Sequence, residues 1–145
     1  MRKFAIWMLV LTVFGSPAVA REDTVEELKA RLQRAAPQDR PPLCVQIAER
    51  QLRSADLLFR DGDVEKAHAA VDDIVTYSEQ ARESSVATRK HLKNVEIAMR
   101  KIAERLRDVK RSLSIEDQPA VQHAVERLED IRTALLKQMF SKEKK

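Results

Sequence analysis

The stretch VEKAHAAVDDIVTYSEQARESSVATRKHLKNVEIAMRKIAERLRDVKRSL, residues 64–113, carries apolar or small side chains at alternating intervals of three and four residues. This spacing persists over seven heptads, and no proline or glycine interrupts it. It is typical of a helix that packs one edge against its neighbours, as in a coiled coil. We therefore predict that the stretch is helical and that the seam is buried. The seam positions are Val64, Ala67, Val71, Ile74, Ser78, Ala81, Ser85, Thr88, Leu92, Val95, Met99, Ile102, Leu106, Val109 and Leu113.

The seam changes character in its middle. Its two ends are apolar and branched, whereas four central positions are small or polar: Ser78, Ala81, Ser85 and Thr88. Small side chains bury little apolar area, so packing stabilises this part less. We predict two apolar contact zones, with a weak point near Ser84 and Ser85 where the helix could bend or break.

Two shorter segments flank this stretch, and each has the length of one contact zone. Residues 42–60 repeat apolar side chains at Val45, Ala48, Leu52, Ala55 and Phe59. Residues 117–140 do so at Val121, Val125, Leu128, Ile131, Leu135 and Met139. The turn before Val64 contains Gly62, which suits a left-handed conformation, and Asp63, which can cap the next helix. Each flanking segment is therefore predicted to fold back over the nearer half of the long stretch.

These lengths allow two all-α architectures. In the first, residues 64–113 form one long coiled-coil-like helix, and elongated antiparallel helical hairpins are built around it. In the second, the helix breaks and a compact up-down four-helix bundle results. We favour the unbroken helix, because no residue near Ser84 and Ser85 forbids helical structure.

The chain before residue 42 is expected to hold an export signal and a short helix. Arg2 and Lys3, an apolar run over 4–14 and Ala18-Val19-Ala20 are typical of a cleavable signal peptide at 1–20, with cleavage between Ala20 and Arg21. The apolar run is shorter than the ~20 residues that span a bilayer. We therefore expect an exported protein, periplasmic or secreted, that meets the membrane only through this signal.

The mature chain then divides into three parts. Residues 21–41 are predicted to form a short helix, about 24–36, followed by a stiff proline-rich linker that is not helical. Thr24 and Glu27 have the spacing of a capping box. Residues 42–140 form the helical domain, and residues 141–145 a charged tail.

Positive charge is concentrated in residues 89–111, which hold nine Lys or Arg and three acids. On the helical frame most of these charges lie outside the seam, as on any solvated helix face. Five of them are candidate contacts to an anionic surface: Lys93, Arg100, Arg107, Lys101 and Arg111. Nucleic-acid binding is not expected, because aromatic stacking residues and known modules are missing.

The residues that could perform chemistry are scattered. His68, His91 and His123 stand far apart, and none has a second histidine or cysteine at helical contact spacing, so no metal site or cofactor is expected. Cys44 is the only cysteine, and it either lies buried or forms an intermolecular bridge. No set of nucleophile, base and orienting group is recognisable, so we do not expect an enzyme.

The sequence thus favours an exported helical scaffold or adaptor. Its partner would be a protein or an anionic component of the cell envelope, and self-association would help an extended chain of this size. Two alternatives stay open. One is a periplasmic holdase-type chaperone with a groove at the polar middle of the long helix. The other is a small-ligand or haem-binding helical bundle.

Overall fold

A computed structural model describes residues 21–141 of the chain. The predicted export signal, residues 1–20, and residues 142–145 of the predicted tail lie outside the described residues. The described chain is all-α and contains no strand, which confirms the predicted fold class. Its elements are α1 (Val25–Arg34), a short 3-10 helix (Pro37–Asp39), α2 (Arg40–Arg60), α3 (Val64–Thr88), α4 (Leu92–Arg111) and α5 (Gln118–Phe140).

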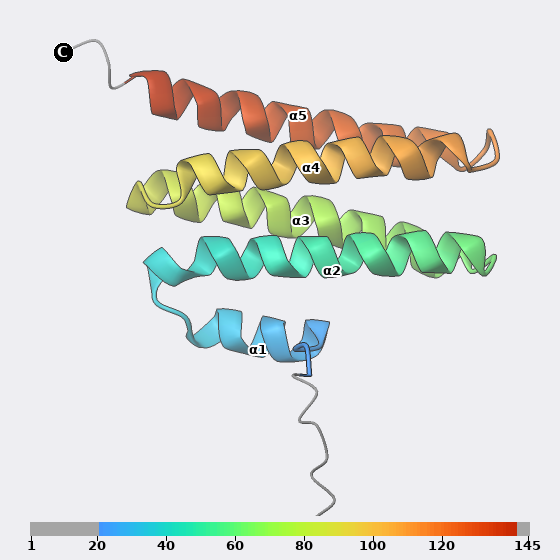
Figure 1. Cartoon of the computed structure of the whole chain (residues 1–145), viewed down its shortest axis with the longest axis horizontal. Coiled ribbons are helices and arrows are strands. Elements are labelled where there is room, and N and C mark those ends of the chain that lie inside the picture. Colours follow the sequence, from blue (N-terminus) through green and yellow to red (C-terminus); the bar gives the residue numbers. More distant parts are fainter. Residues whose placement is uncertain (1–20, 142–145) are drawn as a thin grey trace, which may run out of the picture.

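The helices form two antiparallel hairpins that pack on each other (Figure 1). The first hairpin pairs α2 with α3, and the second pairs α4 with α5, as the segment lengths predict. Helix α3 also packs against α5, and α2 against α4, whereas no contact joins α2 to α5 within the described chain. Helix α1 lies along the outer side of the first hairpin, mainly against α2.

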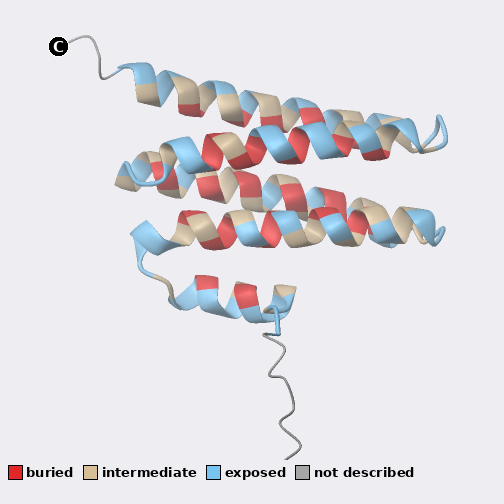
Figure 2. Ribbon diagram, viewed as in Figure 1, coloured by how far each residue is buried: buried red, intermediate tan, exposed pale blue. Residues whose placement is uncertain are grey.

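The seam is buried, as predicted. Of its fifteen positions, only Val64, Thr88, Leu92 and Leu113 are partly exposed, and they lie at its two ends and where it crosses from α3 to α4. Figure 2 shows buried residues on all five helices, and most of them belong to one hydrophobic cluster. Each hairpin contributes several of the fully buried branched residues, so the core is continuous across both hairpins.

The favoured unbroken helix is wrong, because residues 64–113 form two helices. The chain turns between Thr88 and Leu92, about one helical turn after the expected weak point at Ser84 and Ser85. Arg89 and His91 adopt left-handed backbone conformations there, with φ of 56° and 63°. The alternative architecture, a compact up-down four-helix bundle, is therefore the observed one.

The break is stabilised locally and by packing. Thr88 Oγ donates to the Ser84 carbonyl at 2.7 Å and accepts from the Lys90 amide at 3.4 Å, which closes α3. A left-handed conformation costs a non-glycine residue roughly 1–2 kcal/mol. Full burial of one Val, Leu or Ile contributes roughly 1.5–3 kcal/mol. Packing the two hairpins together therefore needs only two or three such side chains to offset the cost of the turn.

The small, polar part of the seam lies in the centre of the bundle. Ser78, Ala81 and Ser85 are each fully buried. The hydroxyl oxygens of Ser78 and Ser85 have no hydrogen-bond partner among the described residues. Small side chains at these positions allow α3 to lie close to its neighbours. Ser78 and Ser85 themselves therefore line no open groove, whereas Ser84 and Thr88 border a shallow groove between α3 and the 37–39 turn.

The predicted local signals around α1 and α3 are partly confirmed. Thr24 and Glu27 form the capping box at the start of α1, and Gly62 is left-handed, with φ of 78°. The side chain of Asp63, however, makes no capping hydrogen bond. The proline-rich linker is also more helical than expected. Residues 37–39 form a 3-10 turn, and α2 begins at Arg40, because proline is tolerated in the first helical turn.

Candidate anion-contact surface on helix α4

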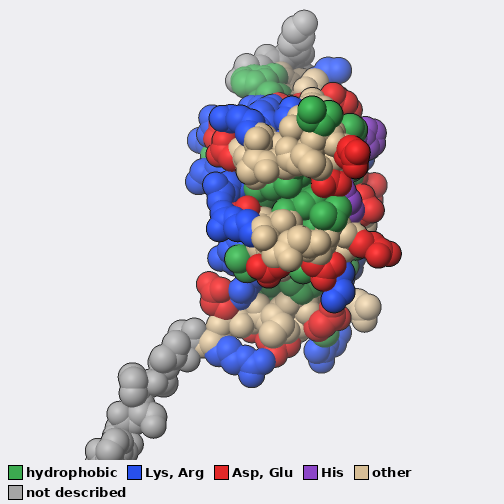
Figure 3. Space-filling view, turned by 90° about the vertical axis from the view of Figure 1, so that its right-hand side faces the viewer, with side chains coloured by type: hydrophobic (Ala, Val, Ile, Leu, Met, Phe, Trp, Pro, Cys, Tyr) green, Lys and Arg blue, Asp and Glu red, His purple; other side chains and the backbone are tan. Residues whose placement is uncertain are grey.

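Charge is divided unevenly between the helices. Helix α4 carries seven Lys or Arg and three acids, whereas α3 carries two basic and five acidic residues. Figure 3 views the bundle from the end that holds the α2–α3 and α4–α5 turns. Its left edge, which corresponds to the front of Figure 1 where α4 lies, is richer in Lys and Arg, and its right edge is richer in acids and histidine.

The apolar stripe of α4 fixes which of its charges reach solvent. Val95, Met99, Ile102, Leu106 and Val109 are buried against the rest of the bundle. The opposite side of the helix therefore points outward, and it holds most of the basic residues that the sequence singles out.

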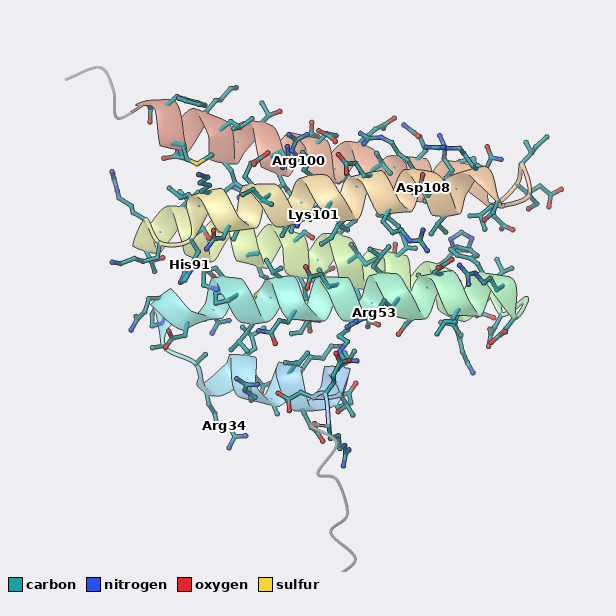
Figure 4. The ribbon with its side chains drawn as sticks, viewed as in Figure 1. Arg34, Arg53, His91, Arg100, Lys101 and Asp108 are labelled. Carbon is teal, nitrogen blue, oxygen red and sulfur yellow. The ribbon has the colours of Figure 1, made fainter. Side chains whose placement is uncertain are left out.

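Three of the five candidate residues are free cations. Lys93, Arg100 and Lys101 are exposed, and none of them makes an ion pair with another described residue. Figure 4 shows Arg100 at the border of α4 with α5 and Lys101 on the front of α4. We refer to Lys93, Arg100 and Lys101 as the free cations of α4.

The other two candidates have partners within the chain. Arg107 Nη2 donates to Glu129 Oε1 of α5 at 2.7 Å, and Arg111 lies 3.0 Å from Asp108 on α4 itself. The Glu129 carboxylate is partly desolvated, but hydrogen bonds from Arg107 and Arg132 outweigh that effect and lower its pKa. Arg107 therefore joins the two helices and is less available to an external anion than the three free cations.

A buried ion pair, which the sequence did not reveal, links α4 to α5. The sequence spacing suggests Arg100 as the partner of Glu96, but Glu96 is only 9% exposed and faces α5. Arg132 donates to Glu96 Oε1 from Nε at 3.0 Å and from Nη2 at 2.9 Å. Its Nη1 also donates to Glu129 at 2.7 Å. The sequence shows only that Glu96 is a charged residue next to the seam. Its partner on α5 depends on how the two helices are aligned, which the sequence does not specify.

The single thiol has an inert environment. Cys44 is fully buried in the core, and burial raises the pKa of its thiol to about 11. A protonated, inaccessible thiol is a poor nucleophile and is not placed to form an intermolecular bridge. Of the two roles that the sequence left open, the structure thus shows the buried one.

The histidines do not come together. His68 Nε2 lies 3.3 Å from Asp117 Oδ1 in the α4–α5 turn, and its ring meets Phe59 edge to face. The Asp117 carboxyl has a lowered pKa because it accepts hydrogen bonds from Ser114 and His68. No group of three potential metal ligands exists in the part of the chain that the structure describes.

The best-formed hollows are open surface grooves rather than enclosed chambers. One groove lies between α1 and α2 and includes Glu22, Arg50 and Arg53. A second lies between the C-terminal ends of α2 and α4, where Arg105 donates to Asp56 at 3.0 Å. Basic and acidic groups are already paired in both places, so neither groove presents a cluster suited to catalysis.

The chain has no match among protein-family models, curated proteins or solved structures. Among the described helices, none combines the length and apolarity needed to cross a bilayer.

Proposed function

We propose that the protein is an exported helical adaptor or scaffold that binds an anionic partner in the cell envelope through the free cations of α4. The observation that carries this proposal is the exposure of Lys93, Arg100 and Lys101 without an acidic partner on the most basic helix. A cation that is already paired gains less from an external anion, because it must give up its own partner. The three free cations keep their full attraction for a partner.

The rest of the molecule supports a role through surface contacts. The two hairpins enclose a continuous apolar core, and the buried carboxylate of Glu96 is engaged by Arg132. The buried stripe of α4 holds the opposite, charged face of this helix in a fixed position on the bundle. A rigid, charged helix face suits recognition of a complementary surface.

The two alternatives gain no specific support. The seam residues Ser78 and Ser85 are buried, and the nearby groove beside Ser84 and Thr88 is bordered by the charged side chains of Arg40 and Glu83, which gives an unfolded apolar client little to bind. Met99 is buried, but the histidines lie at the surface or in the contact with Asp117, which leaves no core histidine to bind haem.

Removal of the free cations should weaken binding to a soluble polyanion. At low salt, we expect heparin to bind about tenfold more weakly to the triple variant Lys93→Gln, Arg100→Gln, Lys101→Gln. Fluorescence anisotropy of the labelled chain from Arg21 onward measures this affinity. Circular dichroism should show an unchanged helical content, because all three side chains are exposed.

The matched control removes three exposed cations from other surfaces: Arg34, Arg53 and Lys66, each changed to Gln. This variant has the same net charge as the α4 variant, so any effect of overall charge is identical. The proposal expects the control to bind several-fold more tightly than the α4 variant. Equal affinities of the two variants would show that α4 has no special role.

A further inference from the structure

One end of the bundle gathers two segments without any acidic residue. Residues 84–95 form the end of α3, the turn and the start of α4, and they contain three cations and no acid. Residues 131–141, at the end of α5, contain two cations and no acid. We call these two segments together the acid-free end.

The antiparallel pairing of α4 with α5 brings the two segments together. Glu96 and Arg132 are hydrogen-bonded, so the first turn of α4 and the last two turns of α5 lie at the same end of the bundle, on the left in Figure 1. Glu83, the next acid along α3, borders this end, because it lines a groove together with Ser84, Ala87 and Thr88. Arg132 is already paired with Glu96 and Glu129. The cations that this end presents to solvent are therefore Arg89, Lys90, Lys93 and Lys137.

An exposed aromatic side chain lies within this basic surface. Phe140 is 62% exposed. It follows Glu129 by eleven residues, which is close to three helical turns, so both side chains point to the same flank of α5. On α4, Lys93 and Arg100 share a flank with Arg107, and Arg107 is paired with Glu129. Phe140 thus lies on the flank of α5 that faces the two free cations.

We infer that the acid-free end docks on a membrane surface that contains anionic lipids, with Phe140 inserted among the headgroups. This inference rests on the proposed function and names the anionic partner. Apolar side chains such as Phe enter the boundary between headgroups and acyl chains, and each Lys or Arg near an anionic leaflet contributes about 1 kcal/mol. Arg89, Lys90, Lys93 and Lys137 are all exposed at this end.

A lipid surface explains the combination of exposed cations with an exposed aromatic ring better than a soluble polyanion does. A polyanion would use the cations but would gain little from an exposed aromatic ring. An apolar protein groove would use the ring but would not need cations all around it. This docking differs from the expected membrane contact through the signal peptide, because it involves the folded domain itself.

The experiment uses the chain from Arg21 onward, which retains every described contact and lacks the apolar run at 4–14. The only tryptophan of the protein, Trp7, is then absent, so Phe140→Trp introduces a single tryptophan whose emission reports on this position. Vesicles of phosphatidylcholine alone are compared with vesicles in which about one-third of the lipid is phosphatidylglycerol. We expect a blue shift of the emission with the anionic vesicles only.

Co-sedimentation with the same vesicles then tests the role of the ring. Phe140→Ser should weaken binding to anionic vesicles by roughly tenfold, because the apolar contact with lipid is lost. The matched control is Leu57→Ser, which changes an apolar side chain that is 58% exposed on α2, and it should bind like the unsubstituted chain.

The outcomes separate this inference from the proposed function. No blue shift, or equal binding of the Phe140→Ser and Leu57→Ser variants, overturns lipid docking. Equal binding to neutral and anionic vesicles also overturns it. If heparin binding still depends on the free cations of α4 in that case, the adaptor proposal stands and its partner is a soluble anion or a protein. If heparin binding does not depend on the free cations of α4 and vesicle binding does not depend on Phe140, both the adaptor proposal and lipid docking are overturned.

Discussion

Leu106→Asp is expected to abolish the cooperative unfolding transition of the bundle. Leu106 is fully buried at the centre of the α4 stripe, so the substitution removes an apolar contact and places a carboxylate in the core. A buried group without a partner and a lost leucine together cost on the order of 4–5 kcal/mol or more. Small domains are stabilised by only about 5–15 kcal/mol in total. Thermal denaturation followed by circular dichroism at 222 nm measures the effect.

The control for this experiment is Leu57→Asp, which makes the same chemical change at a largely exposed position on α2. Its effect on the free energy of unfolding should stay within about 0.5 kcal/mol. If Leu106→Asp melted at the same temperature as the Leu57→Asp control, the orientation of α4 described here would be wrong.

The second large effect is expected from Arg132→Leu. This change leaves Glu96, which is only 9% exposed, without its cation. Because the pair is partly buried, we expect a cost of about 2–3 kcal/mol, below the roughly 3–5 kcal/mol for breaking a fully buried pair. Urea denaturation gives the difference in the free energy of unfolding. The pair links α4 to α5, so we expect the second hairpin to lose protection from amide hydrogen exchange before the first.

A double substitution separates the lost pair from a general loss of packing. Glu96→Leu together with Arg132→Leu removes both charges, and it should recover most of the stability lost in the single variant. Arg111→Leu serves as the exposed control, because the Arg111–Asp108 pair lies at the surface and should contribute less than about 1 kcal/mol. A double variant no more stable than Arg132→Leu alone would argue against a buried charge at Glu96.

Much of the fold follows from local patterns in the sequence. The spacing of the seam predicts which side of α3 and α4 is buried, and segment lengths predict which helices pair. The Thr24–Glu27 capping box and the left-handed Gly62 depend only on neighbouring residues, and both are found. Such features need no knowledge of how distant parts of the chain meet.

The break between α3 and α4 could not be located in the same way. The left-handed positions are occupied by Arg89, which has no preference for that conformation, and by His91, whose enrichment there is too weak to locate a turn. What favours the break is the packing of one hairpin on the other, and this is a property of the whole bundle. The sequence pointed instead to Ser84 and Ser85, but the helix continues through both, and the small side chain of Ser85 fits the crowded centre.

The candidate surface could be predicted only in part, because some of its contacts depend on how α5 is aligned with α4. The exposure of Lys93, Arg100 and Lys101 follows from the seam alone. The engagement of Arg107 by Glu129 depends on the alignment of α5 with α4, which the sequence does not specify. The proximity of Phe140 to the free cations depends on that same alignment.

A distance measurement across the break between α3 and α4 tests most directly whether the chain folds back into a bundle at this point. Spin labels at Glu65 and Arg111, both exposed, are introduced in a Cys44→Ala background and measured by pulsed electron resonance. In the bundle both sites lie at the end where His68 meets Asp117. We predict a separation within roughly 30 Å, because neighbouring helix axes lie about 8–10 Å apart. A separation of roughly 70 Å, which is the length of an unbroken helix between these residues, would contradict the account.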